Sequence, residues 1–193
     1  MKPSERKLYD YLEEYAQKRG EERFLADEES SYTVSETFGI VKSLAEQLEN
    51  AGVKSGDFVS VKADRTVKTI LVFYALEIMG AVAVMHDPRE RMTHDIRIED
   101  GILNAYGRET TLSFEAREVK KLKVSEDGKA AGAVIFTSGS TGESKAVVLS
   151  QYNFINNSLD TLEIGGYRED DINILIVPLH HVFGLALVVT AVV

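Results

Sequence analysis

The sequence predicts an α/β fold with a mostly parallel sheet flanked by helices. Three neighbouring segments carry this prediction. Residues 58–63 alternate like a half-buried strand, residues 66–79 are apolar nearly all round like a buried helix, and residues 81–85 form a small apolar strand. The order strand, helix, strand is typical of a parallel βαβ unit, in which the helix carries the chain back across the sheet.

Two helices and a short strand are predicted before this unit. An apolar face at helical spacing predicts the first helix, with Ser4 as its N-cap and Gly20 at its end. Residues 23–27 predict a short strand. The letters TVSE at 33–36 form a capping box, in which the first and last side chains each satisfy a free backbone N–H. The second helix therefore begins here and ends near Gly52.

The pattern after residue 85 is uneven. Residues 92–124 leave two alternatives open, a strand at 94–100 or a helix over 95–106. The rest of the chain predicts two strands around a Ser/Thr/Gly loop, a helix, a buried strand and a last helix. Their positions are 131–136, 146–150, 151–162 with Ser150 as N-cap, 170–177, and a start just after His181.

Composition and charge exclude several classes of protein. The 31 acidic residues outnumber the 22 basic ones and give a net charge of −9, which argues against nucleic-acid binding. There is no cysteine, so disulfides and thiolate metal sites are excluded. The N-terminal residues lack the apolar region of a secretion signal, and the apolar run 182–193 is too short to cross a bilayer. We therefore expect a cytoplasmic protein without an integral membrane segment.

Residues 137–145, TSGSTGESK, gather groups that suit phosphate binding. The backbone N–H groups of Gly139 and Gly142 can approach a ligand closely, and Lys145 adds a positive charge. Hydroxyl donors come from four neighbours: Thr137, Ser138, Ser140 and Thr141. The alternative is a polar hairpin tip without a ligand. Lys145 and the apolar strand before the loop favour phosphate binding.

Other catalytic and metal-binding patterns do not fit. A Walker A loop needs Gly before its Lys and a helix after it, whereas Lys145 follows Ser144 and leads into a predicted strand. No Gly-x-Ser-x-Gly motif of a serine hydrolase is present. His86 and His94 have no metal-binding partner at a suitable spacing, so no metal site is expected.

The segment FTSGSTGESKAVV, residues 136–148, resembles the phosphate-loop signature of the adenylate-forming enzymes, such as acyl- and aryl-CoA synthetases. Residues 177–185, VPLHHVFGL, are similar to the family's next motif, and residues 31–84 resemble its opening. Two positions depart from the family pattern: Ser144 replaces a Pro and Ala146 replaces a Gly. The connection from residue 84 to residue 137 is also shorter than usual, which implies a missing or trimmed strand–helix unit.

The resemblance implies that residues 1–193 are the N-terminal part of the large AMP-binding domain. Within it, residues 1–124 are the opening α/β region, and residues 131–193 hold the phosphate loop and the strand–helix units that follow. The remainder of the family's domain, with its catalytic Lys, is expected beyond Val193. The fragment alone is therefore expected to be inactive.

The resemblance further implies a parent enzyme that activates a small carboxylic acid, such as a fatty acid, as acyl-AMP and passes it to CoA. ATP, Mg²⁺ and CoA are the implied cofactors. The ATP phosphates are expected at Thr137, Ser138, Gly139, Ser140, Thr141, Gly142 and Lys145. His181 and Phe183 are expected to face the acyl pocket.

Two alternatives stay open at this point. His181 fits a core histidine at a helix start equally well, and His180 is interpreted as structural. A degenerate relative that binds nucleotide or a partner without catalysis is the alternative function. Ser144 and Ala146 favour that alternative, whereas the intact Thr/Ser/Gly loop and Lys145 favour an enzyme.

Overall fold

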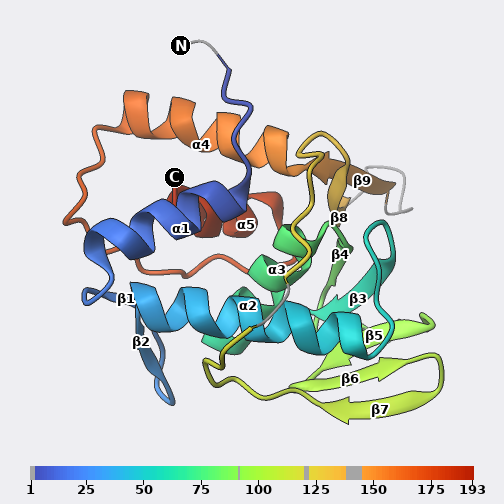
Figure 1. Ribbon diagram of the computed structural model, residues 1–193. Helices are drawn as coiled ribbons and strands as arrows, with labels where there is room; N and C mark the ends of the chain where they lie inside the picture. Colours follow the sequence, from blue (N-terminus) through green and yellow to red (C-terminus); the bar gives the residue numbers. More distant parts are fainter. Residues whose placement is uncertain (1–2, 91, 120–121, 138–144) are drawn as a thin grey trace.

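The computed structural model describes residues 3–90, 92–119, 122–137 and 145–193, and its strands form two sheets (Figure 1). The strands are β1 Arg23–Ala26, β2 Ser31–Thr33, β3 Phe58–Lys62, β4 Val82–His86, β5 Ile96–Glu99, β6 Ile102–Ala105, β7 Arg108–Thr111, β8 Ala131–Thr137 and β9 Lys145–Ser150. β1 and β2 form an antiparallel pair of their own. The other seven strands form one sheet with the order β7-β6-β5-β3-β4-β8-β9.

In the described part of the chain, five helices cover one face of the large sheet (Figure 1). They are α1 Leu8–Arg19, α2 Val34–Asn50, α3 Val67–Met79, α4 Gln151–Gly165 and α5 Val182–Thr190. Each helix contributes side chains to the main core, together with strand residues of that face such as Met85 and Ile135. On the opposite face, Val82, Val84 and Val134 form a smaller cluster, to which no helix of the described residues contributes.

The predicted βαβ unit is confirmed. β3 and β4 pair in parallel, with Lys62 opposite His86. α3 begins after Thr66, whose hydroxyl accepts a hydrogen bond from the backbone N–H of Thr69 at 3.3 Å. It ends at Gly80, whose φ of 77° favours glycine. Nearly every residue of α3 is buried, because this uniformly apolar helix lies between the sheet and the other helices.

The sheet is parallel at its centre and antiparallel at both margins. β5, β3, β4 and β8 run parallel, which confirms the α/β fold class. β9 returns from β8 as a hairpin, and β5, β6 and β7 form a meander. The helix alternative for 95–106 is therefore wrong. Asp100–Gly101 and Tyr106–Gly107 have positive φ, so both meander turns suit the twist of a two-residue hairpin.

Two of the three predicted helix caps are confirmed. At α2, the Thr33 hydroxyl accepts from the Glu36 N–H at 3.2 Å, and the Glu36 carboxylate accepts from the Thr33 N–H at 2.8 Å. At α4, the Ser150 hydroxyl accepts from the Asn153 N–H at 3.2 Å. Both caps satisfy backbone donors that the first helical turn leaves free.

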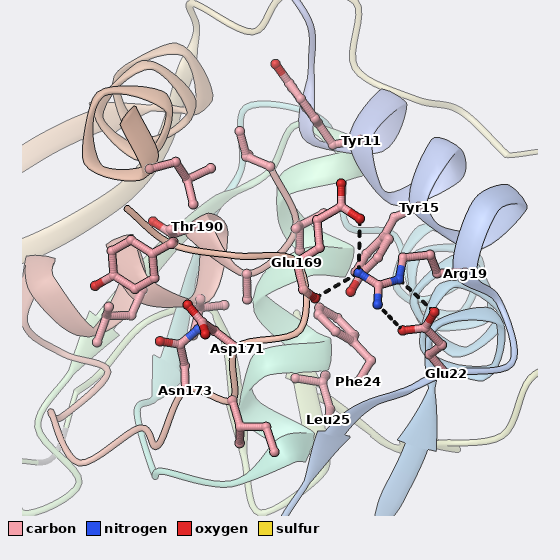
Figure 2. Close-up of a pocket in the computed structure, with 18 of the residues that line it drawn as sticks. Tyr11, Tyr15, Arg19, Glu22, Phe24, Leu25, Glu169, Asp171, Asn173 and Thr190 are labelled. Atoms are coloured by element: carbon pink, nitrogen blue, oxygen red, sulfur yellow. Dashed lines mark hydrogen bonds and ion pairs between the residues drawn. The ribbon is translucent and has the colours of Figure 1, made fainter. Parts of the chain in front are cut away.

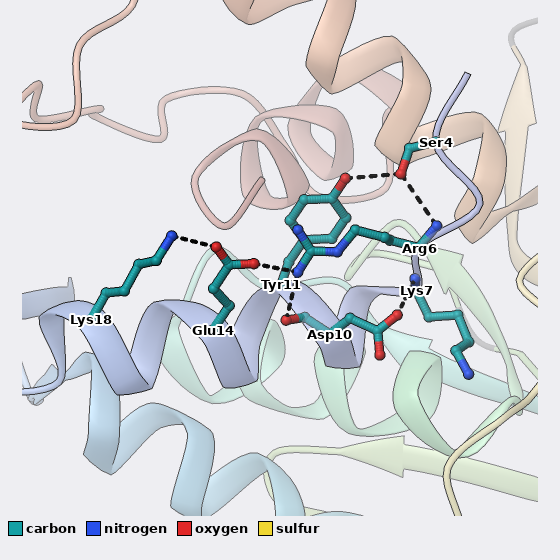
Figure 3. A network of polar contacts seen from close by, with 7 residues as sticks. All are labelled: Ser4, Arg6, Lys7, Asp10, Tyr11, Glu14 and Lys18. Carbon is teal, nitrogen blue, oxygen red and sulfur yellow. Dashed lines mark hydrogen bonds and ion pairs between the residues drawn. The ribbon is translucent and has the colours of Figure 1, made fainter. Parts of the chain in front are cut away.

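The predicted cap of α1 is wrong. Lys7, not Ser4, is the N-cap, and the Asp10 carboxylate accepts a hydrogen bond from its N–H at 2.9 Å. Ser4 instead lies 3.0 Å from the Tyr11 hydroxyl (Figure 3). Its backbone N–H donates to the Asn156 side chain of α4 at 2.7 Å. Ser4 thus joins the N-terminal segment to α4, which the local sequence pattern does not reveal.

The buried strand predicted at 170–177 is also wrong. This segment belongs to neither sheet, and Ile172, Ile174 and Ile176 are 90%, 80% and 71% exposed. Its alternating apolar pattern is that of a strand, but no described strand pairs with it. A strand needs a neighbour to satisfy its backbone groups, and the sequence pattern alone does not supply one.

Buried polar groups join α1, α3 and α4. The Leu8 N–H donates to Gln151 Oε1 at 3.0 Å, and Gln151 Nε2 donates to the Glu77 carbonyl oxygen at 2.6 Å. The Glu77 side chain is also buried, and its Oε1 has no hydrogen-bond partner among the described residues. A Cβ at Gly132 of β8 would come within 2.7 Å of this oxygen, so the carboxyl group lies directly against the β8 backbone.

No helix in the described ranges combines the length and the apolar character needed to cross a bilayer.

Candidate phosphate site at the carboxyl edge of the sheet

Three parallel strands end at the same edge of the large sheet. Lys62, His86 and Thr137 are the last residues of β3, β4 and β8. The pairing of β3 with β4 and of β4 with β8 is parallel, so these ends lie side by side. Open α/β sheets bind ligands outside the carboxyl ends of their strands. This edge is therefore the natural place for a ligand in the fold.

The β8–β9 hairpin places the two ends of the predicted phosphate loop together. Thr137 pairs with Lys145, and the Thr137 hydroxyl donates to the Lys145 carbonyl oxygen at 3.4 Å. Both residues are exposed. Lys145 opens a strand and not a helix, which agrees with the exclusion of a Walker A loop. The other predicted loop residues lie outside the described residues: Ser138, Gly139, Ser140, Thr141 and Gly142.

His181 lies directly before α5, and its ring is close to that of its neighbour His180 but tilted by 44° from it. The two ring centroids are 4.4 Å apart, and His181 occupies the N-cap position without a side-chain capping bond. His180 Nε2 lies 3.6 Å from Oδ2 of Asp87, the residue that follows β4. The histidine pair is thereby attached to the carboxyl edge of the sheet.

Asp87 and Arg89 are site residues that the sequence analysis did not identify. Arg89 Nε donates to Asp87 Oδ1 at 2.9 Å. This bond, with that from the Arg89 backbone, holds the pKa of Asp87 well below its usual range. The position of Asp87 directly after an apolar strand is the signal that could have identified it. The carboxylate stays ionised and can orient the ring of His180.

Burial lowers the pKa of the His180 ring. Its pKa lies below the usual value because the ring is removed from water and lies beside His181, while Asp87 acts in the opposite direction. His180 Nδ1 and His86 Nε2 are buried without a hydrogen-bond partner in the described part of the chain. Each of these ring nitrogens can donate or accept one hydrogen bond, depending on the tautomer.

Phe183 is 58% exposed, and His181 is exposed beside it. The described residues therefore do not enclose an acyl pocket around them. A groove of about 990 Å³ lies elsewhere, between α1, β1 and residues 167–175, and its lining contains none of the predicted site residues (Figure 2). The described residues contain no group of three His, Asp or Glu side chains arranged to hold a metal ion.

A family model described as AMP-binding enzyme matches residues 12–95 and 91–193. The two matches together extend over nearly the whole sequence. The chain belongs to the AMP-binding enzyme family. Membership of this family agrees with the resemblance to adenylate-forming enzymes found in residues 136–148. Curated relatives of the chain are CoA ligases.

The 2-succinylbenzoate–CoA ligase of a Bacillus cereus strain is 29% identical over 178 aligned positions, and the match covers 83% of this chain and 36% of the relative. The ligase of the same name from Bacillus thuringiensis subsp. konkukian has the same identity and coverage. The chain therefore spans about a third of the length of these relatives.

Solved structures show the same fold. O-succinylbenzoate coenzyme A synthetase from Bacillus subtilis, in complex with AMP, has a TM-score of 0.76 at 22% identity, over 99% of this chain and 53% of that one. A long-chain-fatty-acid–CoA ligase from Archaeoglobus fulgidus has a TM-score of 0.79 at 19% identity, over 100% of this chain and 46% of that one. VinN has a TM-score of 0.79 at 19% identity, over 97% and 54%.

Proposed function

We propose that this chain forms the ATP-phosphate-binding part of an AMP-forming acid–thiol ligase. The observation that carries the proposal is the β8–β9 hairpin, which sets Thr137 opposite Lys145 at the carboxyl edge of the parallel strands. A hydroxyl and an ammonium group at the two ends of a Gly-rich loop suit the oxygens of a polyphosphate. The family match and the CoA ligases among the relatives support this assignment.

The proposed reaction has two steps. A carboxylate oxygen of the acid attacks the α-phosphorus of ATP, the bond from that phosphorus to the bridging oxygen breaks, and pyrophosphate leaves. The sulfur of CoA, having lost its proton, then attacks the acyl carbon, and AMP leaves. In the first step Lys145 and Thr137, with the loop residues 138–142, hold the β- and γ-phosphates. Fixed donors aimed at developing charge are the main source of acceleration in such reactions.

The proposed roles of the other groups are more limited. His181 and Phe183 lie at the exposed start of α5 and contact the carboxylate or acyl group once further polypeptide encloses them. Mg²⁺ accompanies ATP in this proposal. The described residues offer no cluster of ligands for it. The triphosphate oxygens themselves are suitable ligands for this hard cation.

The acid is proposed from the relatives. Those with 29% identity are named for 2-succinylbenzoate, and a fold neighbour is named for long-chain fatty acids. An aromatic dicarboxylic acid is therefore the first candidate substrate and a fatty acid is the second. A pyrophosphate-release assay with both acids, ATP and CoA tests activity. The 193-residue chain alone is expected to give no turnover, since it matches only 36% of the relative's length.

ATP binding by the chain tests the phosphate site directly. Lys145→Ala removes one charge-assisted donor and is expected to weaken ATP binding roughly 10- to 100-fold, as measured by titration calorimetry. Lys54→Ala is the matched control, because Lys54 is an exposed lysine in the turn before β3, outside the β8–β9 hairpin. Equal affinities of Lys145→Ala and the unaltered chain contradict the proposed role. Absence of ATP binding in the unaltered chain contradicts the proposed phosphate site, and of the non-catalytic alternatives it leaves the one that binds a partner.

A further inference from the structure

The backbone at the start of α5 is fixed, but it does not fix the side chain of His181. The His181 N–H donates to the Pro178 carbonyl oxygen at 3.2 Å, and the Gly184 N–H donates to the His181 carbonyl oxygen at 3.0 Å. A Cβ at Gly184 would lie 2.3 Å from the Pro178 oxygen, so this turn is tightly packed. The His181 side chain, in contrast, is exposed and makes no capping bond. Its orientation therefore depends on what its ring contacts.

The ring of His180 provides such a contact. Its centroid lies 4.4 Å from that of His181, and the two ring planes are 44° apart. The His180 side chain is only 17% exposed, so the surrounding residues limit its movement. A ring held in place beside an exposed ring restricts the rotamers that the second one can adopt. The groups that hold His180 therefore also influence His181.

Packing alone does not explain a histidine at position 180. Burying a polar atom without a hydrogen-bond partner costs free energy, and His180 Nδ1 is buried without one in the described part of the chain. A phenyl ring would fill similar space without this cost. The other ring nitrogen, Nε2, lies 3.6 Å from Oδ2 of Asp87. The polar character of His180 is therefore used on the side of Asp87.

The Asp87 carboxylate is itself held in a defined orientation. Its Oδ1 accepts hydrogen bonds from the Arg89 backbone N–H and from Arg89 Nε, both at 2.9 Å. Arg89 Nη2 donates to Oδ2. The Asp87 side chain is 16% exposed, and partial removal from water strengthens its interaction with a neighbouring group. Asp87 is thus a fixed acceptor that faces Nε2 of His180.

The charge of Asp87 determines which nitrogen of His180 carries the proton. A neutral imidazole has one N–H, and the nitrogen that faces an acceptor is the favoured place for it. At 3.6 Å the contact is longer than a hydrogen bond, so the attraction is electrostatic. Burial and the neighbouring His181 lower the pKa of His180, and Arg89 acts in the same direction. Asp87 and Glu90 raise it. The neutral tautomer with its proton on Nε2 is therefore favoured.

We propose that Asp87 and His180 are positioning residues for His181. The carboxylate holds the His180 ring through Nε2, and this ring limits rotation of the His181 imidazole at the exposed start of α5. A side chain that is oriented before its ligand arrives loses less conformational freedom on binding. The inference rests on the proposed function only for the ligand of His181, which is the carboxylate or acyl group. The contacts themselves need neither ATP nor an acid.

Nitrogen NMR of the histidine side chains tests the contact between Asp87 and His180. At about pH 8 His180 is neutral, because its pKa lies below the ordinary value of 6.5, and the chemical shifts of its ring nitrogens show which one carries the proton. Nε2 is expected to carry it in the unaltered chain. Asp87→Asn keeps the Oδ1 acceptor but places an NH₂ donor opposite Nε2, so the proton is expected to move to Nδ1. A proton on Nδ1 in the unaltered chain, or the same tautomer in both proteins, overturns the proposal.

The nuclear Overhauser effect between the ring protons of His180 and His181 tests the second contact. Asp87→Ala releases both rings, and free sampling of three χ1 wells lowers this effect to about a third. Asp87→Asn is expected to retain most of it, because the amide still faces Nε2. Asp64→Ala is the matched control, since the Asp64 carboxylate follows β3 and pairs with Lys62. An unchanged effect in Asp87→Ala, or an equal loss in the control, overturns the proposal. If Asp87→Ala does not fold, the tautomer of the unaltered chain decides.

These measurements are independent of the ATP titration. The expected tautomers and ring contacts in a chain that binds no ATP support the positioning pair and contradict the proposed phosphate site. ATP binding by a chain whose His180 carries its proton on Nδ1 gives the opposite result. It supports the phosphate site and overturns the role of Asp87 and His180.

Discussion

Helix α3 and the segment 168–177 are both rich in aliphatic residues, yet one is buried on nearly all sides and the other presents its isoleucines to solvent. α3 forms its backbone hydrogen bonds within itself and needs only apolar neighbours, which the sheet and the other helices provide. The segment needs a partner strand for its backbone, and none is present among the described strands. Apolar sequence thus determines burial only where the backbone is also satisfied.

The largest expected effect lies in α3. Phe73 is fully buried, and its ring lies 6.2 Å from that of Phe154 in an edge-on arrangement. Phe73→Ala is expected to lower the free energy of unfolding by about 3–5 kcal/mol, through lost burial and the cavity left behind. Urea unfolding of both proteins measures this change. A loss below about 1 kcal/mol means that α3 is not the packed centre of the fold.

A second effect concerns the buried carboxyl group of the same helix. Burial raises the pKa of Glu77 to about 8. Because the folded chain keeps a proton that the unfolded chain releases near pH 4.5, Glu77 lowers stability progressively as pH rises from about 4.5 to 8, by about 1.4 kcal/mol per pH unit. Below pH 4.5 both states are protonated and the dependence disappears.

Glu77→Gln isolates this contribution, because the amide keeps the shape and cannot ionise. The variant is expected to gain stability relative to the unaltered chain between about pH 5 and pH 8, as measured by urea unfolding at each pH. Parallel curves for the two proteins contradict a buried, protonated Glu77. Other titrating groups are common to both proteins and cancel in the difference.

The smallest expected effect lies in the segment. Ile174→Ala in the chain alone is expected to change the free energy of unfolding by less than about 0.5 kcal/mol, since an exposed side chain loses few contacts. Thermal and urea unfolding both measure it. A loss comparable to that of Phe73→Ala contradicts the exposed position and removes the contrast between the two regions.

Local patterns predicted the elements whose stability is local. The apolar α3, the capping box at Thr33, the N-cap at Ser150 and the strands around the Ser/Thr/Gly loop were all predicted from short windows. The cap of α1 was not, because the Ser4 backbone bonds instead to Asn156 of α4, 152 positions away. Windows of sequence carry no information about such distant partners.

The candidate site was predicted only in part, because some of its contacts join residues that are far apart in the sequence. Thr137 and Lys145 lie opposite each other, as a hairpin requires. The contact between Asp87 and His180 depends on the order of strands in the sheet and on the path of the chain before α5. Neither is encoded in a motif, so Asp87 was found only in three dimensions. The role of His181 and Phe183 in an acyl pocket stays a prediction.

The bond between the Leu8 N–H and Gln151 Oε1 spans 143 positions in sequence and has a consequence for synthesis on the ribosome. At about 5–20 residues per second, α1 leaves the ribosome roughly 7–30 s before the side chain that receives its first N–H is made. During this interval the helix start bonds to water and its apolar face lacks part of its final cover. Chaperones that bind exposed apolar helices therefore have a defined period in which to engage α1, which closes when α4 emerges.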